Sequence, residues 1–231
     1  MKTLGMIGGV GPESTVDYYQ NIIAMYRERK PDGHYPQFVI NSIDLQKGID
    51  FLEANDLAGM TDFLLSEIDK LPGAGAQFGI IAANTPHIVF DDVRARAPIP
   101  FISIVEASCD HVKQRGMKRL ALFGTRYTMQ ADFYQRVFAR EGIELVTPDP
   151  KDQDYIHEKY FAELVPGIFL PETRENLLAI VDRMKAKIDI EGVLLAGTEL
   201  ALILRDESHN GIALLDTGKI HCQAAMEEMF K

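Results

Sequence analysis

Two short segments contain the polar residues best placed to bind a small ligand. Residues 82–87 are Ala-Ala-Asn-Thr-Pro-His, and residues 195–200 are Leu-Ala-Gly-Thr-Glu-Leu. Each follows a strand-like apolar run and precedes a helix-like pattern, so backbone N–H groups and hydroxyls stand where a strand gives way to a helix. Such an end suits a small anion such as a carboxylate. Because the construction occurs once in each half of the chain, we expect two such ends to face one ligand.

The residues that directly precede these polar pairs cannot take part in proton transfer. Ala83 precedes Asn84-Thr85, and Gly197 precedes Thr198-Glu199. Neither position carries an acid, a base or a nucleophile, and this absence limits the chemistry that the two segments can support.

Two further strand ends carry residues of the same kind. The segment Gly8-Gly9-Val10-Gly11-Pro12 follows the first apolar run, and its glycines let the backbone approach a ligand closely. We expect Ser14 or Thr15 to cap the helix that follows. A dinucleotide site is not expected, because Pro12 intervenes and the third glycine of the Gly-x-Gly-x-x-Gly pattern is missing.

In the second half of the chain, residues 123–128 are Phe-Gly-Thr-Arg-Tyr-Thr. Thr125 and Thr128 can offer hydroxyls to a ligand oxygen, and Tyr127 can close over it. The alternative is that Thr128 only caps a helix that starts near Met129. Ligands of open α/β sheets bind at the carboxyl ends of strands, and four strand ends now offer small polar groups there.

Composition excludes several classes of function. The chain has 231 residues and a net charge of −10, which argues against nucleic acid or an anionic membrane as a partner. No apolar run approaches the roughly 18 to 20 residues that cross a bilayer, and no signal-peptide pattern opens the chain. Cys109 and Cys222 are the two cysteines, so neither a disulfide framework nor a metal cluster is expected. These features predict a soluble, cytoplasmic protein without a metal.

Strand-like and helix-like segments alternate along the chain. Apolar runs predict strands at residues 3–8, 37–42, 77–82, 100–104, 119–123, 143–146, 192–196 and 212–215. Helical patterns cover residues 14–29, 57–71, 87–95, 106–115, 130–140, 152–164, 172–187 and 217–230. This order predicts an α/β fold with parallel sheets covered by helices on both faces. We expect an N-terminal lobe of residues 1–99 plus 210–231 and a central lobe of residues 100–209, each with a sheet of about four strands.

Taken together, these segments resemble the aspartate/glutamate racemases, a family of cofactor-independent amino-acid racemases. Four motifs carry the resemblance, in the family's order and over essentially the whole chain: Gly8-Gly9-Val10-Gly11-Pro12, Asn84-Thr85-Pro86-His87, Gly124-Thr125-Arg126-Tyr127-Thr128 and Thr198-Glu199-Leu200. The resemblance implies two pseudo-symmetric α/β lobes with the active site between them, a homodimer, no cofactor and a small amino acid or dicarboxylate as ligand.

The resemblance also implies a chemistry that this chain cannot perform in the usual way. In the family, a cysteine on each face of the substrate exchanges the proton of the α-carbon, and the matching positions here are Ala83 and Gly197. Some members hold a side-chain carboxylate with a lysine late in a long helix, where this chain has Val165. Lys47 matches a family arginine loosely. The ligand is expected to meet Gly9, Lys47, Asn84, Thr85, Thr125, Tyr127, Thr128, Thr198 and Glu199.

Two classes of function remain open. One is an enzyme, either a racemase with other bases or an isomerase or lyase with altered chemistry. The other is a non-catalytic protein that binds an amino acid or carboxylate. His87 is the nearest titratable candidate for a replacement acid or base, although a histidine there more often bonds a backbone carbonyl. An engineered loss of the thiols is a third alternative.

Overall fold

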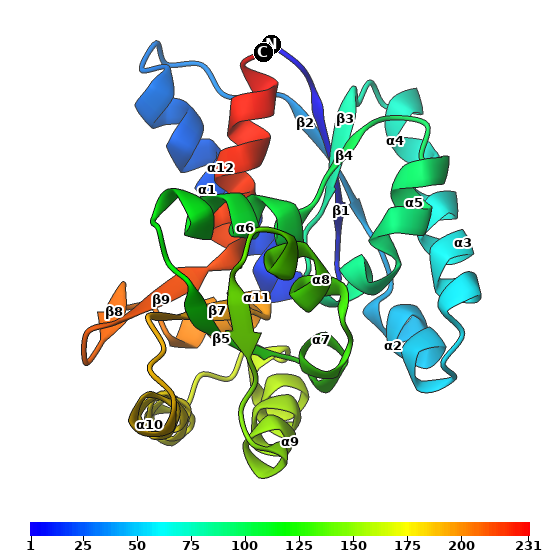
Figure 1. Cartoon of the computed structure of the whole chain (residues 1–231). Helices are drawn as coiled ribbons and strands as arrows, with labels where there is room; N and C mark the ends of the chain where they lie inside the picture. The colour runs from blue at the N-terminus through cyan, green and yellow to red at the C-terminus, as the bar shows by residue number, and fades with distance from the viewer. The chain divides into compact units, whose positions relative to one another are not determined.

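The computed structural model describes residues 1–231, which divide into two compact units. The first unit comprises Met1–Ala107 and Gly218–Lys231, and the second comprises Ser108–Thr217. The chain passes into the second unit within helix α6 (Ile104–Gln114) and returns at the start of helix α12 (Thr217–Met229), as Figure 1 allows the reader to follow. The second unit is therefore an insertion within the first.

The first unit is built on a four-stranded parallel sheet. Its strands are β1 (Leu4–Gly8), β2 (Phe38–Ser42), β3 (Phe78–Ile81) and β4 (Phe101–Ile102), in the spatial order β2-β1-β3-β4. Its helices, besides α12 and the start of α6, are α1 (Pro12–Arg29), α2 (Leu45–Glu53), α3 (Leu57–Ile68), α4 (Lys70–Gly73), the 3₁₀ helix η1 (Thr85–Val89) and α5 (Phe90–Arg96).

Both faces of this sheet are covered because its strands are apolar on both faces. Leu4 and Met6 pack with α1 and α12, whereas the alternate residue Ile7 packs with α3 and α5. Figure 1 shows α1 and α12 on one side of the strands and α3 and α5 on the other. Continuous apolar strands thus predict a parallel sheet between two helix layers, as observed.

The second unit contains a five-stranded sheet that is parallel except at one edge. Its strands are β5 (Arg119–Gly124), β6 (Glu144–Val146), β7 (Gly192–Ala196), β8 (Ser208–His209) and β9 (Ile212–Asp216), in the order β6-β5-β7-β9-β8. Only the pair β8–β9 is antiparallel. The helices are α7 (Arg126–Gln130), α8 (Phe133–Arg140), α9 (Pro150–Lys159), the π-helix η2 (Tyr160–Leu164), α10 (Pro171–Lys187) and α11 (Thr198–Ile203).

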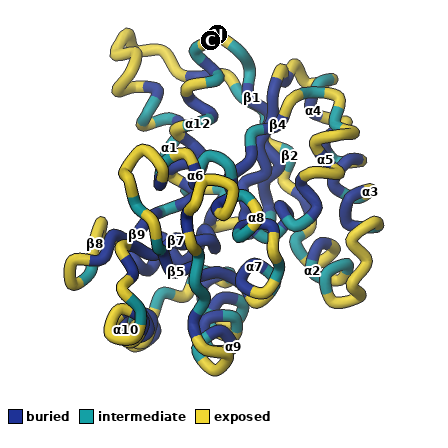
Figure 2. The backbone as a smooth tube through the Cα atoms, viewed as in Figure 1, coloured by how far each residue is buried: buried dark blue, intermediate teal, exposed yellow.

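The largest core of the second unit lies under one face of its sheet. Phe123 and Leu195 contribute from the strands, and Ile156, Leu177 and Leu200 contribute from helices α9, α10 and α11. Figure 2 shows strands β5 and β7 as buried along most of their length. The carboxyl ends of these strands are therefore fixed by a packed interior.

The predicted α/β fold with two helix-flanked sheets is confirmed, with differences in detail. The strand predicted at residues 212–215, which was expected in the N-terminal lobe, is β9 and pairs with β7 in the second sheet. Its residues are buried on both faces there, so it belongs to the interior of that sheet and not to an edge of the first. Strand β8 and helix α2 were not predicted. None of the helices is both long enough and apolar enough to cross a bilayer.

Candidate functional site

In the first unit, the carboxyl ends of β1 and β3 lie side by side. The strands are adjacent and parallel, with Ile7 opposite Ile81, so the glycine loop after β1 and the segment from Ala82 after β3 share one edge of the sheet. The hydroxyl of Ser14 donates a hydrogen bond to the carbonyl oxygen of Ala82 at 3.2 Å and ties the two ends together. Two of the predicted site segments are thus neighbours in space.

Gly9 is required by the close approach of two backbone segments. Its φ is +81°, and a Cβ there would lie 2.3 Å from the carbonyl oxygen of Ile43. Its N–H donates to the hydroxyl of Thr15 at 2.8 Å, so this amide is already engaged within the loop. The expected capping by Ser14 or Thr15 is wrong, because helix α1 begins at Pro12 and its N-cap residue has no side-chain hydrogen bond. Both hydroxyls instead bond other parts of this sheet edge.

The segment after β3 turns at once into the 3₁₀ helix η1, which runs directly into α5, so the helix expected over residues 87–95 is divided between these two elements. Ala83 and Asn84 are buried, at 6% and 2% exposed, and Thr85 is half-buried. The N–H of His87 donates to the carbonyl of Asn84 at 2.9 Å. These contacts place Asn84 and Thr85 at the end of the strand, as predicted.

Both ring nitrogens of His87 are engaged by backbone groups. Nδ1 lies 2.9 Å from the carbonyl oxygen of Ala83, and Nε2 accepts the N–H of Ile104 at 3.2 Å. Since a carbonyl can only accept and Nε2 accepts here, the proton sits on Nδ1 and the ring is neutral. Burial lowers the pKa of His87 to about 3, with the nearby His221 ring adding to the effect. The ring stacks on Phe90 with centroids 4.7 Å apart.

His221 forms a second neutral imidazole in the same interior. Its Nε2 lies 3.0 Å from the carbonyl oxygen of Ile102, and its Nδ1 accepts the hydroxyl of Tyr18 at 3.0 Å. Burial lowers the pKa of His221 to about 4. The two histidine rings are 6.1 Å apart and meet edge to face. The two neutral rings thus satisfy polar groups of β4, α1 and the start of α6.

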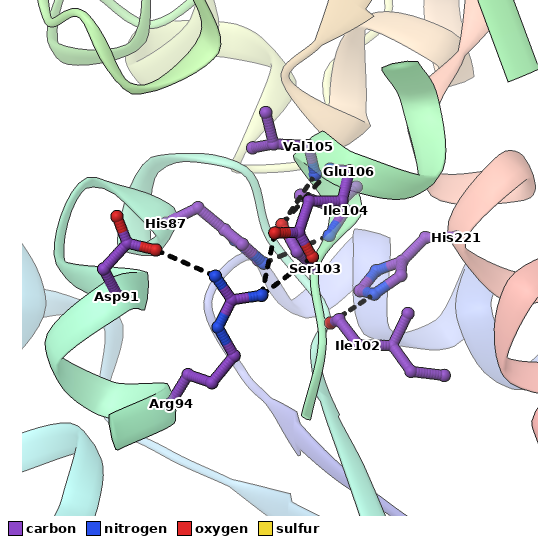
Figure 3. Close-up of polar contacts among 9 residues, drawn as sticks. All are labelled: His87, Asp91, Arg94, Ile102, Ser103, Ile104, Val105, Glu106 and His221. Atoms are coloured by element: carbon purple, nitrogen blue, oxygen red, sulfur yellow. Dashed lines mark hydrogen bonds and ion pairs between the residues drawn. The ribbon is translucent and has the colours of Figure 1, made fainter. Parts of the chain in front are cut away.

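Figure 3 shows how the start of α6 is held next to His87. The hydroxyl of Ser103 accepts the N–H groups of Val105 and Glu106, at 3.2 and 3.3 Å. On the outside, the guanidinium of Arg94 reaches Glu106 at 2.7 Å and Asp91 at 3.0 Å. The pair with Glu106 connects α5 with α6, the pair with Asp91 lies within α5, and both lie outside the predicted site.

Lys47 lies on the exposed side of helix α2. Its ammonium group stands 5.9 Å from the ring centre of Phe63, and its charge helps to lower the pKa of Glu67, after the larger effects of Lys70 and Asn41. The structure therefore gives Lys47 surface contacts within α2 and α3.

In the second unit, the ends of β5 and β7 are also neighbours. Gly124 pairs with Ala196, so Thr125 and Gly197 follow adjacent strands at the same edge. The hydroxyl of Thr125 accepts the N–H of Thr128 and lies 3.2 Å from its hydroxyl. Thr125, not Thr128, therefore caps the helix, which begins at Arg126. Tyr127 is half-buried and meets the ring of His157 edge to face.

The end of β7 carries a buried polar cluster that includes a residue the sequence did not predict. Glu199 is fully buried, and its Oε2 accepts hydrogen bonds from the hydroxyl of Thr198 at 3.0 Å and from the hydroxyl of Tyr160. Burial, followed by the charge of Glu199, raises the pKa of Tyr160 well above its usual value. Tyr160 lies far away in the sequence, within a segment that has only a helical pattern, so no local signal marks it.

Comparison with known proteins identifies the family. A family model described as Asp/Glu/Hydantoin racemase matches residues 7–225. The chain belongs to this family. Among curated proteins, the broad specificity amino-acid racemase RacX of Bacillus subtilis (strain 168) is 23% identical over 219 residues, which are 93% of this chain and 92% of that protein.

Solved structures of the racemase family share the fold over the full chain. A putative Asp/Glu racemase from Yersinia pestis is similar with a TM-score of 0.89 and 29% identity, and both chains are covered completely. An aspartate racemase homologue from Pyrococcus horikoshii OT3 gives a TM-score of 0.83 and 32% identity, again with complete coverage of both chains. The resemblance inferred from four short motifs is thus confirmed at the level of family and fold. No group of three or more His, Cys, Asp or Glu side chains is arranged to hold a metal ion.

Proposed function

We propose that the protein binds a small amino acid or dicarboxylate at the polar ends of its parallel strands, and that two-thiol racemisation is very weak or absent. The carrying observation is the pair Ala83 and Gly197, which stand at the positions that the resemblance assigns to the two acid–base cysteines. Removing an α-proton without a cofactor needs a base on one face of the substrate and an acid on the other. A methyl group and a hydrogen atom supply neither.

The two cysteines that the chain does contain cannot replace the missing acid–base thiols. Cys109 and Cys222 form no disulfide, and both are buried, at 2% and 0% exposed. Cys109 directs its sulfur to the carbonyl of Val137 at 3.9 Å, and Cys222 belongs to the core under β1 and β3. Buried thiols in such surroundings behave as small apolar residues.

His87 also fits a structural role better than a catalytic one. Its Nε2 lone pair accepts the N–H of Ile104, and a pKa of about 3 leaves the neutral ring a weak base. The residues best suited to hold a ligand are therefore polar and uncharged, namely Asn84, Thr85, Thr125, Thr128 and Thr198, with Gly9, Lys47, Tyr127 and Glu199 completing the predicted set. The proposal further includes a homodimer, a cytoplasmic location and no cofactor.

The test is to incubate the protein with each enantiomer of aspartate, glutamate and other amino acids in deuterium oxide. Exchange of the α-proton is followed by NMR, and binding is followed by calorimetry on the same samples. Binding without exchange supports the proposal. Robust exchange would overturn the predicted loss of racemisation and would assign the chemistry to other groups. An absence of binding to every amino acid and dicarboxylate would overturn the ligand class.

A further inference from the structure

The ring of Tyr160, and not the backbone conformation, leaves no room for a side chain at position 197. Gly197 has φ −146° and ψ 115°, an extended conformation that any residue can adopt. A Cβ added there would lie 2.6 Å from Cε2 and 3.3 Å from Cζ of Tyr160. A separation below 3.0 Å is essentially never seen for real Cβ atoms. The tyrosine ring therefore occupies the space that any side chain at residue 197 would need.

The ring of Tyr160 is held on several sides. Its side chain is buried, its hydroxyl donates to the carboxylate of Glu199, and its ring meets the ring of Phe161 edge to face with centroids 5.5 Å apart. It also packs into the main core of the second unit. A ring fixed in this way cannot move aside cheaply, unlike the free end of a flexible side chain.

Tyr160 lies where helix α9 gives way to a π-helical turn. Tyr160 opens the π-helix η2, and its carbonyl accepts the N–H of Val165 at 2.9 Å. A π-helical turn inserts one extra residue into a helix and redirects the side chains that follow its start. Val165, at the place of the family lysine, is half-buried and packs against the same core. The ring at the end of β7 and the aliphatic side chain in the core thus come from the two ends of one π-helical turn.

We propose that Tyr160 closes residue 197 to side chains and that Gly197 and Tyr160 are a matched pair. The functional meaning of this pair rests on the proposed function, since residue 197 is the position at which the family carries a thiol. The packing itself does not depend on which ligand binds. The end of β7 therefore presents the backbone of Gly197 and the ring of Tyr160, whose hydroxyl is bonded to Glu199. A cysteine introduced at residue 197 without a change at Tyr160 does not fit.

The experiment is a double-mutant cycle measured by thermal unfolding. Gly197→Ala should lower the midpoint by about 5 °C, because the added Cβ overlaps the ring. In the Tyr160→Ala background, the same change should lower the midpoint little or not at all, since the overlapping atoms are gone. Tyr160→Leu is a second relieving background if Tyr160→Ala does not fold.

Two matched controls sharpen the cycle. Tyr160→Phe keeps the ring and removes the hydroxyl, so Gly197→Ala should remain costly in that background. Gly73→Ala adds a Cβ to another glycine with no atom within 4 Å, and it should not lower the midpoint. Equal losses from Gly197→Ala in the wild-type and Tyr160→Ala or Tyr160→Leu backgrounds would overturn the proposal. If the two positions are coupled in unfolding but the protein binds no amino acid or dicarboxylate, the packing of Tyr160 against residue 197 is upheld and the proposed ligand class is refuted.

Discussion

Nδ1 of His87 lies 2.9 Å from the carbonyl oxygen of Ala83, the residue at the first predicted cysteine position. The same ring accepts the N–H of Ile104, so one imidazole fixes both the end of the β3 segment and the start of α6. A histidine close to a binding segment can thus set the direction of its backbone without taking part in proton transfer. Changes at His87 should accordingly be visible in stability.

We expect His87→Ala to lower the free energy of unfolding by about 2–4 kcal/mol, because it leaves a buried carbonyl and a buried N–H without their partner and opens a cavity. Urea unfolding at neutral pH measures the loss. His34→Ala is the control, since His34 is exposed and its removal should cost less than about 0.5 kcal/mol. Equal effects of the two substitutions would contradict the structural role.

Stability should fall as the pH is lowered from neutral. The pKa values of His87 and His221 are about 3 and about 4 in the folded chain, against 6.5 ordinarily. The unfolded chain therefore binds more protons between these values, and stability present above pH 6.5 is lost as the pH falls towards the folded pKa values. Each histidine contributes a slope of up to about 1.4 kcal/mol per pH unit in this window.

Urea unfolding at about pH 7 and about pH 5 measures this slope. His221→Gln removes one titrating ring and should reduce the slope by about one histidine's share. His111 and His157, whose pKa values are also lowered by burial, are common to both proteins and cancel in the comparison. An unchanged slope in the variant would show that His221 does not titrate as a buried neutral ring.

Gly9→Ala should destabilise the protein far more than the same substitution at Gly142, a glycine with a similar backbone conformation. At Gly9 a Cβ meets the Ile43 carbonyl oxygen at 2.3 Å, in addition to the strain of φ +81°. At Gly142, φ is +66° and no atom lies within 4 Å of the added Cβ. We expect a loss of more than about 3 kcal/mol at Gly9 and about 1 kcal/mol at Gly142, measured by urea unfolding. Similar losses would mean that only the backbone strain matters.

Restoring the thiols should require a change at Tyr160 as well. Ala83→Cys combined with Gly197→Cys and Tyr160→Leu should raise α-proton exchange at least about a hundredfold over the unmodified protein, because acid–base groups contribute on that scale. The two cysteine substitutions without Tyr160→Leu should give a smaller rise. The control is Ala83→Ser combined with Gly197→Ser and Tyr160→Leu. Exchange in all of these variants is followed by NMR in deuterium oxide. Equal exchange by the cysteine and serine variants would refute the assignment of the two positions.

The strands and the polar strand ends were predictable from local patterns. Apolar runs such as Phe78–Ile81 and Gly192–Ala196 appear in the structure within a residue or so of their predicted bounds. Small polar residues follow them because the chain must turn there, and this placed Asn84 and Thr198 correctly at strand ends. Helix α2 was missed, although Asp44 accepts the N–H of Gln46 and is the kind of N-cap residue that signals a helix start.

Features that depend on distant contacts were beyond local patterns. Strand β8 has two polar residues and no periodicity, and it forms only because Ser208 and His209 pair with β9. The overlap between Tyr160 and residue 197 joins positions far apart in the sequence, and the π-helical turn that Tyr160 opens has no characteristic composition. The motif analysis predicted that Gly197 lacks a thiol but not that a ring fills its place.

The insertion of the second unit into the first has a consequence for synthesis on the ribosome. The core beside Leu4 and Met6 is completed by Cys222, Met226 and Met229 of helix α12, and the N–H of Lys2 bonds the carbonyl of Met229 at 2.8 Å. These partners are translated only after the whole of Ser108–Thr217, on the order of ten seconds later at typical elongation rates. The contiguous second unit can close first, while the apolar face of β1 that packs against both α1 and α12 still lacks its α12 cover and stays partly open to chaperones. Strand β1 is thus made before the second unit, yet it is among the last elements to complete its packing.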